Sequence, residues 1–553
     1  MPEGNSTTQS TPLNLWNHYL GKVDPPLFWA TGITTLLAVL YGGISPERFD
    51  TLLTRLQNWI TVNFSWYFLL SVAAYLGVCI VIAFGKYGHL RLGQKDDRPE
   101  FSYFSWIAML FSCGVGVGYI FWAVGEPILH YMAPPYLAQP QTPEAMDVAI
   151  EISVLHWGIS AWAVFALAGL AIALPAYRLG KPMNVSISLY GLFGEKIIGS
   201  RLSQIIEYLA ACATIVGVAT SLGLGIISIN AGIKHLFGSE LSAFGMSMVM
   251  LFIIICYNLS AISGIQKGVK NLSQINIILA FVWGGFILVS GPTVKLLNTT
   301  VNTMGGYLSH FVQMSLWTNP QGDSQWLSWW TLFYWIWWIS WAPFCGGFVA
   351  RISKGRTVRE FLVGVTVVPT LVAIVWFSVI GGTAQHVETQ GIVPLYEALQ
   401  SDMGSGIYVM LSSFPFGNLL NYVILLNLLI FLITSADSAS FFVAMQLARG
   451  TYEPSALLKL ICGTAIGSIG LVLLLSGGLQ ALQKASIIAG TPFSVVIILM
   501  IFSLFKMLDH AWRQEHGLAT EPARASVKKE VHPLKDNSDN PFPSPVLAHT
   551  QNM

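Results

Sequence analysis

The sixteen residues from 329 to 344, WWTLFYWIWWISWAPF, carry six tryptophans and no charged side chain. Tryptophan and tyrosine normally collect in shallow belts where a membrane meets water. Here Trp335, Trp337, Trp338 and Trp341 continue into the apolar run, where leucine or valine would suit lipid equally well. Indole faces gathered in one place hold a quaternary ammonium at about 0.5 to 2 kcal/mol per contact. A bulky packing helix with an interfacial belt is the alternative interpretation.

A second aromatic group, HWGISAWAVF, occupies residues 156–165 of another apolar run. At 100° per residue, Trp157, Trp162 and Phe165 fall within about 140° of arc on a helix. These three rings are candidates for the facing wall of a cation cage. The adjacent His156 is interpreted as a packing histidine in preference to a proton carrier.

The run GVGVG at residues 114–118 has a period of two, which suits neither a helix face nor a phosphate-binding loop. Glycine frees backbone groups and lets a ligand approach them. Unwound backbone inside a membrane is tolerated where it lines a cavity or is buried in protein. The run therefore indicates a ligand site, with close helix packing by small residues as the alternative.

Polar side chains interrupt the apolar run FLITSADSAS at residues 431–440. Its hydroxyl groups belong to Thr434, Ser435, Ser438 and Ser440. The carboxylate of Asp437 is a functional candidate, because an ionisable group inside a membrane is costly. Hydroxyl and carbonyl oxygens together suit Na+, while hydrogen bonding of Ser and Thr to the preceding helical turn is the alternative. Glu126 and Glu207 are weaker candidates, expected to cap a broken helix or to pair with a cytoplasmic arginine.

The composition is that of a polytopic membrane protein, with 54% hydrophobic and 10% charged residues, against about 25% charged residues in soluble domains. A net charge of +1 gives no indication of nucleic acid binding. No signal peptide is expected, because the first 26 residues are polar. The cysteines are interpreted as small buried hydrophobes, and no cofactor is expected. They are Cys79, Cys113, Cys212, Cys256, Cys345 and Cys462.

Twelve stretches are apolar and long enough to span a bilayer, which needs about 20 residues per helix. They are residues 27–44, 65–85, 103–131, 149–176, 203–230, 243–262, 274–294, 329–350, 359–383, 417–446, 457–476 and 485–508. Lys and Arg concentrate in the loops after the even-numbered spans, which predicts that both termini are cytoplasmic. Residues 303–317 and 393–414 are amphipathic and expected along the outer face. Residues 1–26 and 509–553 are expected to be polar tails on a membrane domain of 27–508.

The third and eighth spans resemble each other. Both are aromatic in their first half and are then interrupted by small residues or proline. The interrupting residues are Gly114, Gly116 and Gly118 in one and Pro343, Gly346 and Gly347 in the other. They lie five spans apart, which is an odd number, so the two copies enter the membrane in opposite directions. Interrupted spans at matching positions of inverted halves mark the midplane site of a transporter, which makes spans 3–7 and 8–12 the predicted repeats.

Two other function classes are disfavoured by the sequence. An enzyme would need a nucleophile, base or metal constellation, and the chain has no HExxH, GxSxG or His-rich cluster. A sensor would need a signalling domain larger than the C-terminal tail. Apolar indoles would obstruct an aqueous channel, so a secondary transporter is the favoured class.

The segments WIWWISWAPF, ARISKGRTVRE and FLITSADSAS resemble the betaine/choline/carnitine transporter family, and most of all its sodium-coupled glycine betaine branch. The resemblance covers about residues 27–508. It implies twelve helices with a LeuT-like inverted repeat of five, two extra helices before the repeat, a homotrimer and a bacterial cytoplasmic membrane location. It also implies Na+-coupled symport of a quaternary-ammonium solute, glycine betaine first, by alternating access. Transport of carnitine, choline or dimethylsulfoniopropionate, by exchange or proton coupling, is the alternative.

The resemblance further assigns roles to individual residues. Those implied at the substrate are Trp157, Trp162, Phe165, Trp338, Trp341, Gly114, Val115, Gly116 and Gly118, with Trp337 as a further candidate. Those implied at one sodium ion are Ser112, Val115, Phe431, Thr434 and Ser435, with Asp437 as a further candidate, and at a second sodium ion Thr214 and Phe344. Val218 stands where the second site usually has Thr. Gly118 replaces the Asp of choline carriers, and Cys345 and Asn276 replace the Met and Arg of sodium-independent exchangers.

Overall fold

The computed structural model describes residues 20–518 except 115, 264–265, 323 and 452, and it leaves the side chains of 112–114, 263 and 266–271 undescribed. Within that part the chain forms helices and no strand, and a single bridge pairs Arg91 with Thr357. Ten of the described helices are long and apolar enough to cross a membrane. The prediction of an all-α polytopic membrane protein is confirmed.

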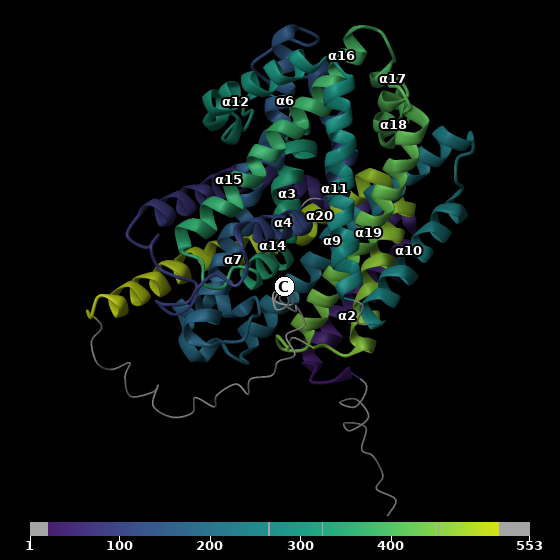
Figure 1. Cartoon of the computed structure of the whole chain (residues 1–553). Coiled ribbons are helices and arrows are strands. Elements are labelled where there is room, and N and C mark those ends of the chain that lie inside the picture. Colours follow the sequence, from purple (N-terminus) through teal and green to yellow (C-terminus); the bar gives the residue numbers. More distant parts are fainter. Residues whose placement is uncertain (1–19, 115, 264–265, 323, 452, 519–553) are drawn as a thin grey trace, which may run out of the picture.

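The helices follow the predicted apolar stretches in order (Figure 1). The first half contains α2 (Pro25–Ile44), α3 (Pro46–Phe84), α4 (Tyr103–Gly114), α5 (Val117–Met132), α6 (Pro143–Trp157), α7 (Ile159–Leu179), α8 (Tyr190–Phe193), α9 (Arg201–Phe237), α10 (Ala243–Ser263) and α11 (Gln266–Ser290). The second half contains α12 (Thr293–Ser315), α13 (Gln325–Leu327), α14 (Phe333–Arg351), α15 (Val358–Trp376), α16 (Gly382–Thr389), α17 (Leu395–Ser401), α18 (Gly406–Leu411), α19 (Gly417–Leu447) and α20 (Ala456–Glu515).

Several predicted boundaries differ from the structure, and α3 begins at Pro46 rather than at position 65. Helix α20 covers both of the last two predicted spans, with non-helical backbone at Gly477 and Gly478 between them. It also continues past position 508 to Glu515, whose carboxylate pairs with Arg178 at 2.8 Å. The count of twelve spans and the inverted repeat stay predictions.

The predicted outer segment 393–414 does not simply lie along the surface. It folds into α17 and α18, which pack against α5, and its Tyr408, Met410 and Leu411 side chains are buried. The segment therefore fills the upper end of the helix bundle (Figure 1). Its apolar residues explain this, because burial among helices removes them from water as well as an interface would.

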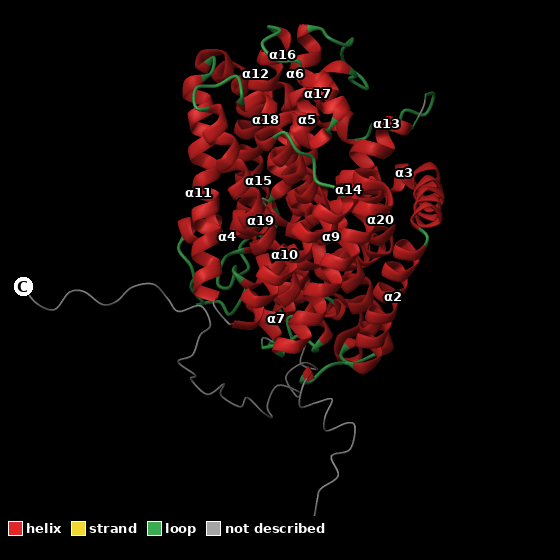
Figure 2. Cartoon of the chain, turned by 90° about the vertical axis from the view of Figure 1, so that its right-hand side faces the viewer, coloured by secondary structure: helices red, strands yellow, loops and turns green. Residues whose placement is uncertain are grey.

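Burial separates a central group of helices from a peripheral one. In the segment Gln325–Arg351, 94% of the most apolar window is buried inside the protein, and in Pro143–Leu179 the share is 89%, whereas in α2 it is 17%. A helix that is apolar all round belongs in a protein core or against lipid. The aromatic helix α14 is therefore a central element rather than a lipid-facing one, and it runs within the bundle in Figure 2.

Small residues let α14 approach α7 closely. A Cβ atom on Gly169 would lie 3.1 Å from the carbonyl oxygen of Gly346, so the two backbones are almost in contact. Small residues at a crossing point are the usual device for close packing of membrane helices. This contact sets the position of the tryptophans that follow one another along α14.

Departures from α-helical geometry occur in several helices of the first and second halves. Non-helical backbone separates α4 from α5 at Gly116 and α6 from α7 at Gly158. A π-helical turn at Ser328–Leu332 precedes α14, and another at Phe377–Gly381 follows α15. Such turns are rare and frequently occur at functional sites.

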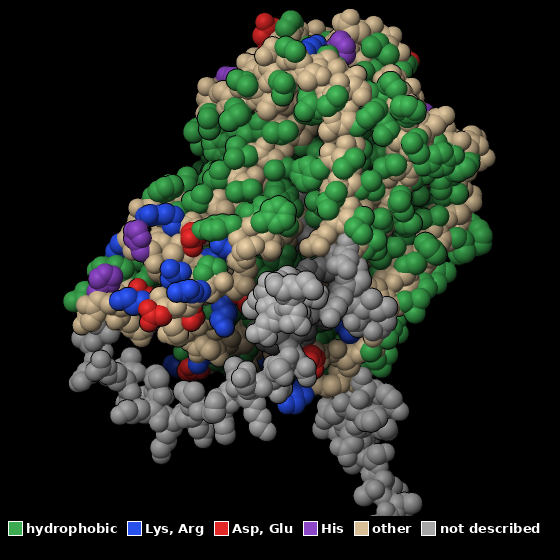
Figure 3. Space-filling view, in the orientation of Figure 1, with side chains coloured by type: hydrophobic (Ala, Val, Ile, Leu, Met, Phe, Trp, Pro, Cys, Tyr) green, Lys and Arg blue, Asp and Glu red, His purple; other side chains and the backbone are tan. Residues whose placement is uncertain are grey.

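The two ends of the described chain lie at the same end of the molecule. The backbone N–H of Asp24, before α2, donates to the carbonyl of Leu447 at the end of α19. The end of α20 joins the end of α7 through the Glu515–Arg178 ion pair. Lys and Arg side chains gather toward this lower end in Figure 3, below a broad hydrophobic belt.

Candidate functional site

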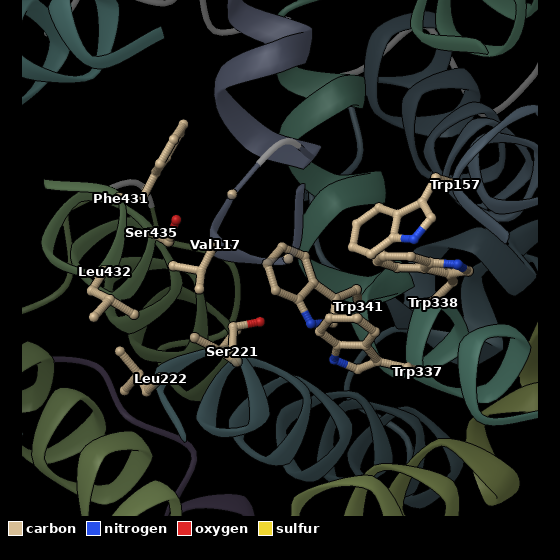
Figure 4. Close-up of a pocket in the computed structure, with 13 residues that line it drawn as sticks. Val117, Trp157, Ser221, Leu222, Trp337, Trp338, Trp341, Phe431, Leu432 and Ser435 are labelled. Atoms are coloured by element: carbon tan, nitrogen blue, oxygen red, sulfur yellow. The ribbon is translucent and has the colours of Figure 1, made fainter. Parts of the chain in front are cut away.

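A small cavity lies where the broken helix α4–α5 meets α9, α14 and α19. Its volume is about 20 Å³, enough for roughly one water molecule. The lining residues are Gly116, Val117, Gly118, Trp157, Val218, Ser221, Leu222, Trp337, Trp338, Trp341, Phe431, Leu432 and Ser435. In Figure 4 the four indoles stand on one side of the cavity, and Val117, Leu432 and Ser435 stand on the other.

The four indoles form one continuous aromatic wall. Trp337 and Trp338 stack with ring centroids 4.7 Å apart, and Trp157 meets Trp338 edge to face at 5.0 Å. Trp341 meets Trp337 at 6.3 Å, nearly perpendicular. A wall of this kind presents π faces and ring edges but no charge of its own. It suits an organic cation that cannot donate hydrogen bonds.

Hydrogen bonds fix the tryptophans of this wall. The Trp338 indole N–H donates to the carbonyl of His156 at 2.8 Å, and the Trp337 indole N–H donates to the carbonyl of Gly217 at 3.1 Å. The Trp341 indole N–H is buried and has no partner within the described part of the chain. That donor is available to a ligand acceptor, and a carboxylate group is the strongest acceptor of this kind.

Two of the predicted cage residues stand behind the wall. Phe165 meets Trp338 at 6.0 Å, and Trp162 meets Phe165 at 5.7 Å, both nearly perpendicular. Neither belongs to the lining of the small cavity. The structure therefore joins all the predicted aromatic residues in one cluster, in which Trp157, Trp337, Trp338 and Trp341 face the cavity.

The predicted ligands of a first sodium ion lie partly at the same cavity. Phe431 and Ser435 line it, and the Ser435 hydroxyl stands 3.8 Å from where a Cβ on Gly116 would be. The Thr434 hydroxyl donates to the carbonyl of Ile430 at 2.9 Å, which is the back-bonding that the sequence left as the alternative. Val115 and the Ser112 side chain are outside the described residues, as is that part of the ion-site prediction.

The other predicted ion ligands do not line this cavity. Thr214 of α9 has a buried hydroxyl with no hydrogen-bond partner in the described structure, and Phe344 lies on α14, which packs against α9. Val218 lines the cavity as an apolar residue. One carboxylate oxygen of Asp437 is buried without a partner, yet Asp437 is not part of the lining.

A polar cluster that the sequence analysis missed lies behind Trp157. The carboxylate of Glu126 lies within hydrogen-bond distance of His130, His156, Trp157 and Tyr334. The expectation that Glu126 caps a broken helix or pairs with a cytoplasmic arginine is wrong. His156, Trp157 and Tyr334 lie on other helices and are thirty or more residues away in the sequence. Only His130 is close in the sequence, and its i,i+4 spacing from Glu126 was the one local pattern that could have predicted the cluster.

The two other candidates for buried polar chemistry, His156 and Glu207, form hydrogen bonds with other groups of the protein. His156 lies 2.7 Å from Glu126 through Nδ1 and 3.0 Å from the Thr331 hydroxyl through Nε2, so it is a packed and bonded histidine. Glu207 accepts the backbone N–H of Ser186 at 2.6 Å, near the lower end. It therefore caps a neighbouring turn.

One group of metal-binding side-chain types occurs in the described residues. Ligand atoms of Glu126, His130 and His156 lie within 4.8 Å of one another. Hydrogen bonds between the carboxylate and both imidazoles already account for this closeness. Asn276, at the position compared with the exchangers, is bonded to Asn427 across α11 and α19.

Buried helices around an aromatic cavity define a polytopic membrane protein. A family model described as BCCT, betaine/carnitine/choline family transporter, matches residues 26–513. The chain therefore belongs to the BCCT family, and it is a membrane transporter rather than an enzyme.

Curated relatives support this assignment over nearly the whole chain. The chain is 40% identical to the glycine betaine transporter OpuD of Bacillus subtilis (strain 168) over 491 residues, which are 88% of this chain and 95% of that protein. It is 36% identical to the ectoine/hydroxyectoine transporter of Virgibacillus pantothenticus, over 88% of this chain and 97% of that protein. It is 35% identical to the osmo-dependent choline transporter BetT2 of Acinetobacter baylyi, over 89% of this chain and 72% of that protein.

Proposed function

We propose that the chain is a Na+-coupled symporter of a quaternary-ammonium compatible solute, glycine betaine first, in a bacterial cytoplasmic membrane. The observation that carries this proposal is the cavity between the four indoles and the broken helix α4–α5. The trimethylammonium group meets the indole faces, where each contact contributes about 0.5 to 2 kcal/mol. The solute carboxylate accepts from the unpartnered Trp341 N–H and from backbone N–H groups at the start of α5.

Selection for betaine over choline is supported by Gly118. A Cβ atom at this position would collide with the Trp157 ring, so no larger side chain fits between α5 and the aromatic wall. Position 118 therefore has no carboxylate that could contact another charged group or a hydroxyl group of the solute. A zwitterion that brings its own carboxylate matches this site better than choline does.

The proposed sodium coupling is supported by Ser435 and Phe431 on the opposite side of the same cavity. An ion bound there would join α19 to the break between α4 and α5, so ion binding and the shape of the solute site would change together. The sodium gradient and the membrane potential, about 2.3 kcal/mol per charge per 100 mV, would drive the cycle. A zwitterionic solute adds no net charge, so uptake is electrogenic. The resemblance also supports a homotrimer.

The test is uptake of labelled glycine betaine into proteoliposomes with an inward Na+ gradient, compared with an equal K+ gradient. Choline, carnitine, dimethylsulfoniopropionate and ectoine serve as unlabelled competitors. Accumulation that needs Na+, produces an inward current and is displaced mainly by betaine is the expected result. Uptake of another of these solutes alone would contradict the betaine assignment, and uptake indifferent to Na+ would contradict the symport.

A further inference from the structure

We propose that Glu126 is a positioning residue of the cation cage, which holds Trp157 and Trp338 in place and puts negative charge behind the aromatic wall. This inference rests on the proposed function, because it concerns how the cage binds a quaternary ammonium. Glu126 lies in the interior of α5 and is fully buried. A buried carboxylate needs specific partners, and the identity of those partners indicates its role.

Both oxygens of the Glu126 carboxylate are engaged. Oε1 accepts the indole N–H of Trp157 at 2.6 Å and the hydroxyl of Tyr334. Oε2 lies 2.7 Å from Nδ1 of His156 and 3.3 Å from Nε2 of His130. Hydrogen bonds to an ionised acceptor are about twice as strong as neutral ones. The carboxylate therefore ties the end of α6, which carries the cage residue Trp157, to α5 and α14.

The same network reaches the second cage tryptophan through His156. The carbonyl of His156 accepts the Trp338 indole N–H at 2.8 Å, and its ring meets Thr331 on the π-helical turn before α14. The position of the His156 backbone, which the hydrogen bonds of its ring help to fix, thus determines where Trp338 is anchored. Trp157 and Trp338 stand edge to face at 5.0 Å, so a shift of either ring changes the surface that a cation meets.

The charge on Glu126 acts on the face of Trp157 as well as on its position. The carboxylate receives the N–H at the edge of the indole, which pushes electron density toward the ring and makes its face more attractive to a cation. In the described structure Glu126 has no Lys or Arg partner, and the imidazoles of His130 and His156 act as neutral hydrogen-bond donors to its carboxylate. The negative charge is therefore not cancelled by a Lys or Arg side chain, and it strengthens binding of a cationic head group.

The experiment compares two ligands of equal shape on the purified protein. Glycine betaine carries the cation, and 3,3-dimethylbutyrate replaces its nitrogen by carbon. Affinities are measured by tryptophan fluorescence for the wild type and Glu126→Gln, which keeps the side-chain volume and removes the charge. Betaine binding is expected to weaken roughly three- to tenfold, and binding of the isostere to change less than twofold. Glu207→Gln, an equally buried carboxylate away from the cage, serves as the control with unchanged affinities.

A double-mutant cycle tests whether the effect passes through Trp157. In a Trp157→Phe background, which lacks the indole N–H, Glu126→Gln is expected to add little further loss of betaine affinity, because the pair acts as one unit. An equal loss for both ligands, an unchanged betaine affinity, or a full additional loss in the Trp157→Phe background would overturn the proposal. A wild type that binds no quaternary ammonium would instead overturn the proposed function.

A second measurement applies if Glu126→Gln does not fold. An NMR spectrum of wild-type protein with ¹⁵N-labelled tryptophan should contain a strongly downfield indole N–H resonance, as expected for donation to a carboxylate. That resonance should be absent from Trp157→Phe and should move when betaine binds. A Trp157 resonance at an ordinary position, or one that betaine does not move, would overturn the proposal.

Discussion

At the residue scale, the closest contact of the site is between Gly118 and Trp157. A Cβ atom on Gly118 would overlap the Trp157 ring, so Gly118→Ala must push that indole out of the wall. We expect the apparent KM for solute to rise severalfold while the protein still purifies as a monodisperse species, because overpacking costs about 1 to 3 kcal/mol and is local. Kinetics of uptake in proteoliposomes measure this.

Gly305→Ala is the matched control for that substitution. Gly305 lies inside α12 with open space around its Cα, so an added methyl group meets no other atom. We expect unchanged transport and a slightly more stable helix, by about 0.5 to 1 kcal/mol. Equal kinetic effects of the two substitutions would contradict the contact between Gly118 and the cage.

The hydroxyl of Ser435 gives a second prediction at this scale. Ser435 lines the cavity, whereas the hydroxyl of Ser438, one turn further along α19, donates to the carbonyl of Thr434 at 3.0 Å. Ser435→Ala is expected to raise the Na+ concentration for half-maximal uptake, and Ser438→Ala is expected to leave it unchanged. Uptake measured against Na+ concentration at fixed solute separates the two. The ion-site assignment fails if the Ser438 variant alone responds.

At the scale of elements, the close contact between α7 and α14 positions the aromatic wall. A Cβ atom added to Gly169 would lie within about 3.2 Å of the backbone oxygen of Gly346 and of the Phe361 ring. A larger side chain at this position must therefore separate α7 from α14. We expect Gly169→Val to lower the thermal unfolding midpoint in detergent and to reduce solute binding together. Gly77→Val, on α3 with open space around it, should change neither. Intact stability of the Gly169 variant would contradict this account of the packing.

The sequence predicted which elements are broken better than it predicted how they are joined. Glycine runs and aromatic runs are local patterns, so the interruption of the third span and the aromatic candidates for a cage could be predicted from the residues, while the cage itself stays a prediction. The Glu126 cluster did not, because Trp157, Tyr334 and His156 reach that carboxylate only after three helices pack. The π-helical turns beside α14 and α15 also follow from packing, since no residue type marks them.

At the scale of the whole molecule, both ends of the described chain lie toward one end of the helix bundle. Asp24 contacts the end of α19, and Glu515 pairs with the end of α7. Together with the excess of Lys and Arg in the loops after the even-numbered spans, this arrangement of the two ends predicts that both termini are cytoplasmic. Green fluorescent protein fused at either terminus should fluoresce, and alkaline phosphatase fused there should be inactive. An active phosphatase fusion at either end would contradict the predicted topology.

The cavity beside the tryptophans has a volume of about 20 Å³, enough for roughly one water molecule. A solute molecule that arrives must therefore wait until the aromatic wall moves apart. The speed of association would then follow the opening of the protein rather than diffusion, and it would level off as solute concentration increases. The apparent dissociation constant would equal the intrinsic one divided by the fraction of time spent open, so a substitution that merely loosens the wall would make the protein bind more tightly without one new contact.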